Sequence, residues 1–373
     1  MNRLNFNRTR GFSLLELLIS MVVGLIIMGA ATQLFKSAMD ATTVITQTAE
    51  IQANARAAIN MMSKDISMAG SGLTSGGFAL AYGAGATASR FAVDQNRTWL
   101  NNNAYPSGQF GNPPTIVPYW MYGLIPGPAN GMELGGPGNI PATNQPADAI
   151  TSVYVDYSFP LNLYQITAMT ATTITLQPPN PAPTNPFPQI LDPTGIKVGD
   201  LIMLSNAKGT AVVEVTGINA GGTVLTFAAN DPLNMNQPAN PPLNSTLAYL
   251  ATVGTATANR ILAVTYFAEV PNNGQLPRLM RQVNGQTPVP VADNIIGLTF
   301  TYDMCDQNNN GGGAVQCAAI ADPIAKGFTL SQIHKVNVTV LAQAMMANGA
   351  NSRSTALSTS VSTRNLSFKD RYN

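Results

Sequence analysis

The pattern of apolar and polar positions changes sharply over the N-terminal part of the chain. Residues 1–11 form a leader with three arginines and no acidic residue, and an uncharged apolar run follows from Leu17 to Phe35. A helix of about 19 residues is about 28 Å long, close to the thickness of bilayer hydrocarbon. The pattern therefore predicts a membrane-spanning helix over residues 12–35.

A second apolar pattern predicts that this helix continues beyond the membrane. Apolar residues recur at spacings of three and four at Ile51, Ala55, Ile59, Met62 and Ile66. This spacing indicates an amphipathic helix with one face on a core. We expect the amphipathic extension to cover residues 36–69 and to end at Gly70 and Gly72, which favour a stop after Ala69.

The remainder, residues 70–373, predicts a β-rich globular region with Gly-, Pro- and Asn-rich loops. A long N-terminal helix followed by antiparallel strands gives an α+β class. The loops are expected at Ser75–Asp148, Pro178–Pro188 and Asp231–Asn244. Strands are predicted at Ala149–Tyr157, Thr173–Leu176, Val198–Leu204, Ala211–Ile218, Thr223–Ala228, Leu247–Val253, Arg260–Val270, Leu279–Val283, Ile295–Tyr302, His334–Ala342 and Ala356–Arg364.

Composition narrows the class of protein. Charged residues make up 10% of the chain and the net charge is +1, so no global field attracts nucleic acid or an anionic membrane. The chain has 32 Gly and 26 Pro, which suits a neutral, loop-rich exported protein. The basic leader is expected to stay in the cytoplasm, which places the rest of the chain on the other side of the membrane.

The two cysteines, Cys305 and Cys317, both lie beyond the membrane segment. In an oxidising periplasm such a pair is expected to form a disulfide, and the alternative is two unrelated buried thiols. Between them, Asp306, Asn308 and Asn310 place oxygen ligands at alternate positions before Gly311, a spacing found in calcium loops. The glutamate of an EF-hand is missing, so a polar turn is favoured and no metal site is expected.

The start of the apolar run allows two interpretations. An ordinary signal peptide would be cut near Gly29-Ala30-Ala31, which removes the apolar segment. However, the string Arg10-Gly-Phe-Ser-Leu-Leu-Glu16 closely resembles the cleavage and methylation motif of type IV prepilins. The resemblance implies that a prepilin peptidase cuts between Gly11 and Phe12 and methylates the new amino group of Phe12. The apolar helix then stays on the mature protein.

Glu16 is the expected subunit-assembly residue. A carboxylate inside an apolar helix is costly unless it is paired. After cleavage the Phe12 amino group is a cation at the end of the same helix, and staggered helices would bring this amine to Glu16 of a neighbouring subunit. The alternative is that Glu16 only reaches the lipid headgroups.

Later segments resemble minor pilins of the PilW type. At the end of the helix these are Asn54-Ala-Arg-Ala-Ala58, Lys64-Asp65-Ile66 and Ala69-Gly70. Further segments are Ala147–Thr151, Val198-Gly-Asp-Leu-Ile202, Ala211–Val215, Leu279-Met-Arg281, Ile295–Tyr302 and Val361–Asn365. Ser67, where an arginine is common, and the expanded loops at 73–147 and 178–190 depart from the pattern.

Three functions are compatible with these features. The first is a minor pilin that takes part in initiation, assembly or tip structure of a type IV pilus, with other minor and major pilins, the prepilin peptidase and the inner-membrane assembly machinery as partners. The second is a type II secretion pseudopilin. The third is a tip adhesin, in which Tyr119, Trp120 and Tyr122 stack on a ligand.

No enzyme or cofactor is expected, because the sequence lacks a phosphate loop and a nucleophile motif. Its single histidine, His334, falls in a strand pattern. The resemblance implies a single-pass inner-membrane protein with a periplasmic head, which becomes extracellular when the filament assembles.

The sequence predicts that the mature chain begins at Phe12, because the peptidase cuts after Gly11 and leaves the helix in place. Mass spectrometry of the N-terminal peptide of membrane-extracted protein measures this directly. A mature chain that begins near Thr32 would instead indicate an ordinary signal peptide.

Overall fold

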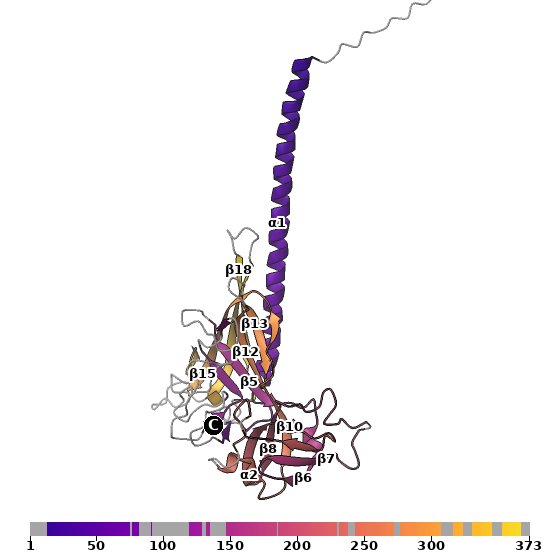
Figure 1. Cartoon of the computed structure of the whole chain (residues 1–373). Helices are drawn as coiled ribbons and strands as arrows, with labels where there is room; N and C mark the ends of the chain where they lie inside the picture. Colours follow the sequence, from indigo (N-terminus) through magenta and orange to yellow (C-terminus); the bar gives the residue numbers. More distant parts are fainter. Residues whose placement is uncertain are drawn as a thin grey trace, which may run out of the picture. The chain divides into compact units, whose positions relative to one another are not determined.

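The computed structural model describes residues 13–74, 77–81, 91, 119–128, 132–134, 147–184, 186–229, 231–237, 243–271, 277–306, 316–323, 330–344 and 353–366. The chain divides into two compact units, residues 1–51 and residues 52–373. Helix α1 (Leu14–Met68) is one continuous helix of 55 residues (Figure 1). The predicted long helix is therefore confirmed, and it is followed by antiparallel sheets in an α+β, pilin-like fold.

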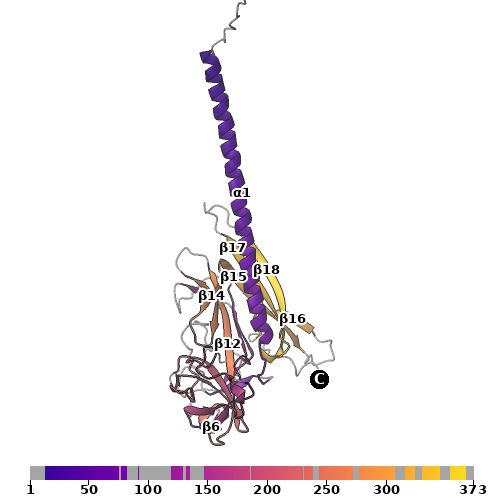
Figure 2. The same cartoon turned by 90° about the vertical axis from the view of Figure 1, so that its right-hand side faces the viewer.

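The part of α1 that belongs to the second unit buries one face. Ala55, Ala58, Met62, Ile66 and Ala69 are each 0% exposed. Three of them belong to the predicted stripe, whereas Ile59 of that stripe is only half-buried and Ala58 and Ala69 are buried in addition. Figure 2 shows these last turns with strands β12 (Thr257–Val270) and β14 (Val289–Ala292) on one side and β16 (Gln316–Ile320) and β18 (Arg353–Ser362) on the other. Burial of this stripe contributes apolar stabilisation that holds these turns on the sheets.

The helix ends in a tightly packed glycine turn. Gly70 has φ +81° and its N–H donates to the carbonyl oxygen of Val153 over 2.8 Å. A Cβ on Gly70 would lie 2.7 Å from Cδ2 of Leu366, close to the C-terminal end of the described chain. Only glycine combines this left-handed backbone with so close an approach.

The larger sheet has the order β14-β13-β12-β5-β3. Its centre is β12 (Thr257–Val270), which pairs antiparallel with β5 (Ala149–Val155) and β13 (Arg278–Val283). β14 (Val289–Ala292) and β3 (Leu124–Gly127) lie at the two ends of this order, and β4 (Met132–Leu134) runs parallel to the end of β12. The start of β12 also pairs with β8 (Leu201–Asn206), which pairs with β9 (Gly209–Glu214).

The second sheet has the order β16-β15-β17-β18. Its strands are β15 (Ile295–Asp306), β16 (Gln316–Ile320), β17 (Ile333–Ala344) and β18 (Arg353–Ser362). Along β17, Val336, Val338 and Val340 are 0% exposed and alternate with polar residues, as expected for a sheet with one covered face. Asp148, just before β5, joins the sheets: its carboxylate accepts from the Phe300 N–H over 3.0 Å.

An inserted lobe, residues 156–256, separates β5 from β12 in the sequence. It contains β8, β9 and a four-stranded sheet of β6 (Gln165–Met169), β7 (Thr173–Gln177), β10 (Gly217–Ile218) and β11 (Val224–Thr226) (Figure 1). Most of one hydrophobic cluster, including Phe159, Ile174, Val213 and Leu247, lies within it. The lobe therefore has a core of its own.

Several sequence-based expectations were wrong. Leu247–Val253 is not a strand: it begins with the short helix α2 (Leu247–Leu250), because the Thr246 hydroxyl accepts from the Tyr249 N–H and caps it. The expected loop Ser75–Asp148 contains β1 (Phe78–Leu80), β2 (Tyr119–Met121), β3 and β4. Strand β6 was not predicted, and Ala211–Ile218 is divided between β9 and β10.

The glycine turn predicts a sharp difference between two alanine variants. Gly254 has φ +77°, similar to Gly70, but a Cβ there meets nothing within 4 Å. Gly254→Ala should lower the free energy of unfolding by about 1–2 kcal/mol, the cost of the left-handed backbone. Gly70→Ala should cost a further 1–3 kcal/mol, roughly, from overpacking against Leu366. Thermal unfolding of both variants tests this, and equal losses would contradict the packing argument.

Candidate assembly site

Glu16 lies in the first turn of α1, and its N–H donates to the Ser13 carbonyl over 3.0 Å. Its neighbours Leu15 and Leu17 are 69% and 58% exposed, so the carboxylate stands in an uncovered apolar surface. Among the residues that the structure describes, Glu16 makes no ion pair. The expected pairing of Glu16 with the Phe12 amino group of a neighbouring subunit stays a prediction.

The other sequence-predicted site residues are only partly described. Gly11 and Phe12 lie outside the described residues, as do Asn308 and Asn310. Cys305 on β15 and Cys317 on β16 are direct partners in the antiparallel register, where Cα atoms are typically about 4.5–5.5 Å apart, within the range that a disulfide spans. The disulfide stays a prediction. Asp306, the last residue of β15, pairs with Gln316, and among the described residues no group of metal-ligating side chains gathers.

A buried carboxylate near the other end of α1 was not singled out as a site from the sequence. Asp65 is 5% exposed and lies on the same helix face as Met62 and Ile66. Oδ1 accepts from the Tyr154 hydroxyl over 2.9 Å, and Oδ2 accepts from the Tyr266 hydroxyl over 2.6 Å. Arg281 Nε also donates to Oδ2, over 2.9 Å. We call these four residues the Asp65 cluster.

The protonation states of the Asp65 cluster follow from its burial. Burial, together with the negative charge and hydrogen bonding of Asp65, raises the pKa of Tyr154 and of Tyr266 well above the usual 10.0. Both tyrosines therefore remain hydrogen-bond donors at physiological pH. Because folding raises these pKa values, the cluster stabilises the fold fully below pH 10 and progressively less as the pH rises above it.

A second charged cluster anchors the inserted lobe to β12. Arg260 donates to the Asp156 carboxylate over 2.6 Å and to the Gly195 carbonyl over 2.8 Å. Burial opposes the charged form of Asp156, but hydrogen bonds from Ser158 and the charge of Arg260 give a net lowering of its pKa. Arg260 also lies 3.8 Å from the Asp200 carboxylate. Burial has the largest influence on Asp200 and raises the pKa of this carboxyl above its usual value.

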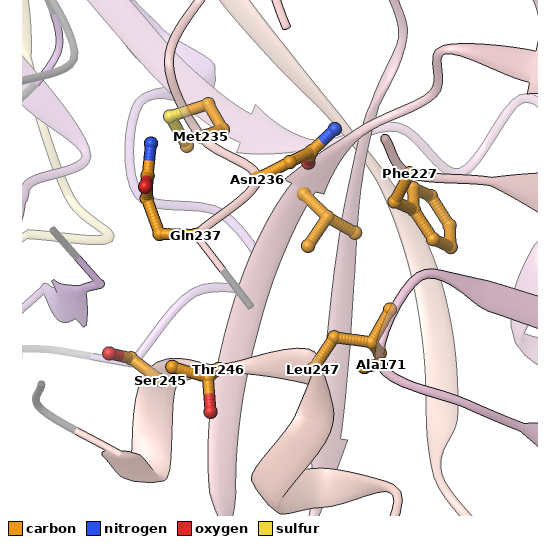
Figure 3. Close-up of a pocket in the computed structure, with 9 residues that line it drawn as sticks. Ala171, Phe227, Met235, Asn236, Gln237, Ser245, Thr246 and Leu247 are labelled. Atoms are coloured by element: carbon orange, nitrogen blue, oxygen red, sulfur yellow. The ribbon is translucent and has the colours of Figure 1, made fainter. Parts of the chain in front are cut away.

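A small pocket inside the inserted lobe is structural. It holds about 10 Å³, room for about one water molecule, between Met235–Gln237 and Ser245–Leu247 (Figure 3). The Asn236 amide is already satisfied, because its Oδ1 accepts from the Glu214 N–H and its Nδ2 donates to the Glu214 and Ala228 carbonyls. The arrangement holds a loop in place and leaves no space for a substrate.

The aromatic residues that suggested ligand stacking lie in and beside a strand. Tyr119 and Trp120 belong to β2, which pairs with β1, and Tyr122 follows it. Trp120 and Tyr122 are half-buried, so each side chain packs partly within its own region and exposes only part of its ring.

Comparison with known proteins bears on the N-terminal end. Residues 6–32 match the family model described as the prokaryotic N-terminal methylation motif. This is a prepilin-type motif. It supports a type IV pilin-like or pseudopilin-like protein that is processed by a prepilin peptidase, and a structural rather than catalytic role. No curated protein and no solved structure matches the chain.

The motif agrees with the physical properties of α1. This helix is long and apolar enough to cross a membrane, and its most apolar window is uncovered in the structure. Both the length and the uncovered apolar surface of α1 fit a membrane anchor that stays on the chain when a peptidase cuts after Gly11.

The Asp65 cluster gives a testable prediction for stability. Tyr266→Phe removes a hydrogen bond to a charged group and should lower the free energy of unfolding by about 1.5–3 kcal/mol. Asp65→Asn should cost about 3 kcal/mol or more, because it leaves Arg281 without its anion. Denaturant unfolding measures both values. Tyr157→Phe is the matched control, since Tyr157 is 62% exposed, and a loss as large as that of Tyr266→Phe would contradict the role of the cluster.

Proposed function

We propose that this chain is a PilW-type minor pilin, which joins other low-abundance pilins to initiate, assemble or form the tip of a type IV pilus. The observation that carries the proposal is the prepilin-type motif on a 55-residue helix that continues into a β-rich head. The inserted lobe enlarges this head, which suits a subunit placed at a filament end, where fewer neighbours restrict its size.

The helix supplies the driving force for assembly. Large apolar side chains along its first half are uncovered, among them Leu25, Ile26, Leu34 and Phe35, each at least 66% exposed. In the membrane, lipid covers these side chains. In a filament, the helices of neighbouring subunits take the place of the lipid. Because lipid is as apolar as these side chains, the exchange is driven by close van der Waals packing between helices rather than by transfer out of water.

Glu16 supplies the register. Apolar contacts are tolerant of sliding, whereas a carboxylate embedded among them is stable only opposite a cation. The amino group of a neighbouring Phe12 is that cation in our proposal. One stagger of the helices satisfies both charges, and other staggers leave both unpaired.

The proposed route of the protein from the membrane to the filament follows from this chemistry. The leader stays in the cytoplasm, α1 crosses the inner membrane once and the head faces the periplasm. The peptidase removes residues 1–11, and the assembly machinery then moves the helix from lipid into the filament. The head is extracellular after assembly.

A pseudopilin shares the motif and the helix, so one experiment has to separate the two functions. Deletion of the gene should reduce the number of surface filaments and leave type II secretion intact. Loss of secreted proteins with normal filaments would assign the chain to a secretion apparatus.

Glu16→Ala should leave the protein stable in the inner membrane but reduce its incorporation into sheared filaments at least tenfold, which corresponds to about 1.4 kcal/mol of lost pairing. Immunoblots of the filament and membrane fractions measure the ratio. Glu50→Ala is the matched control, because Glu50 lies on the same helix outside the apolar run. Wild-type incorporation of Glu16→Ala would contradict the pairing.

A further inference from the structure

A groove of about 650 Å³ lies beside the Asp65 cluster, between α1 and the β13–β14 hairpin. Met61 and Lys64 line it on the helix side, and Arg281, Val289 and Val291 line it on the hairpin side. All of these residues belong to the unit of residues 52–373. The groove is therefore a feature of the head rather than of the membrane anchor.

The polar groups of the groove have a positive balance. The Asp65 carboxylate already accepts three hydrogen bonds within the cluster. Arg281 uses only Nε in these contacts, and its two terminal amino groups make no hydrogen bond with a described residue. Lys64 is exposed and makes no ion pair within the described part of the chain.

The free edge of the Arg281 guanidinium determines which chemical group can bind in the groove. A guanidinium edge presents two parallel N–H groups, which match the two oxygens of a carboxylate. Asp65 fixes the other side of the guanidinium, so this edge is already oriented before a partner arrives. Lys64 adds a second positive charge on the same groove.

The apolar lining shows what surrounds that carboxylate. Met61 is 40% exposed and Val289 is 59% exposed, so apolar surface lies beside the two cations and is open to a partner. Small molecules bind in sites that cover most of their surface. A groove whose walls remain this exposed instead fits an extended or helical protein segment that covers it from outside.

We propose that this groove docks a neighbouring filament subunit through a segment in which an aspartate or glutamate is flanked by apolar residues. The carboxylate binds the free edge of Arg281 and interacts with Lys64, and the apolar neighbours cover Met61 and Val289. The identity of the neighbour as a filament subunit rests on the proposed function above, whereas the chemistry of the segment rests on the groove alone.

Site-specific photocrosslinking of the full-length protein in its own cells tests the docking. Val289→p-benzoylphenylalanine places the probe in the groove, and Val198→p-benzoylphenylalanine is the matched control at a residue that is 60% exposed. We expect at least tenfold more protein–protein adduct at position 289. Mass spectrometry of the linked peptide should find an aspartate or glutamate within about one helical turn of the link, flanked by apolar residues.

Charge reversal is the second part of this test. Lys64→Glu should reduce the adduct at position 289 at least fivefold, whereas Lys208→Glu, a control in the inserted lobe, should not change it. Replacement of the partner's acidic residue by lysine should restore the adduct with Lys64→Glu. An adduct at position 289 no stronger than the control, a linked peptide without an acidic residue, or an adduct that is insensitive to Lys64→Glu would overturn the proposal.

The outcomes also separate this proposal from the proposed function. If the acidic peptide belongs to a protein without a prepilin-type motif, the groove chemistry stands and the filament role of this docking is refuted. If the protein enters filaments and the groove yields no adduct, the filament function stands and the docking site is refuted.

Discussion

The buried carboxylate of Asp65 is the constraint that fixes the last turns of α1, within the unit of residues 52–373, on the larger sheet. Its hydrogen-bond donors come from three strands that are adjacent in the sheet: Tyr154 from β5, Tyr266 from β12 and Arg281 from β13. Tyr266 and Arg281 are direct partners in the strand register, so the sheet presents its donors as one fixed group. A helix that rotated or slid by one position would bury the charge without its partners, which is far more costly than a loss of apolar contact.

This constraint explains how the head accommodates a large insertion. β5 and β12 both contribute to the Asp65 cluster, and the inserted lobe connects the end of one to the start of the other. The lobe has its own core and is tied to β12 by Arg260, which pairs with Asp156. Changes within the lobe therefore leave the strands under the helix in place.

The sequence was sufficient to predict the elements whose apolar residues recur with strong periodicity. The continuous helix, the strands β12, β15 and β17, and the processing motif all follow from local patterns. The charged residues within the segments that resemble minor pilins have structural roles that those patterns did not reveal. Asp65 and Arg281 pair with each other, Asp148 joins two sheets and Asp200 lies beside Arg260.

The features of the structure that the sequence did not predict have physical reasons. The Asp65 cluster joins residues far apart in the chain, and such pairing leaves no local periodicity. One signal was available, because an aspartate at position 65 interrupts the apolar stripe between Met62 and Ala69. Short strands such as β1 to β4 are set by pairing rather than by propensity. The apolar run after Thr246 became a helix because of one capping hydroxyl, which outweighed the composition.

The central claim is that the apolar helix stays on the mature chain and carries the head into a filament. Immunogold labelling of purified filaments with antibodies raised against the inserted lobe tests it most directly. The account predicts label on the filaments, sparse and concentrated at their ends. Label confined to the cell envelope, with unlabelled filaments, would contradict it.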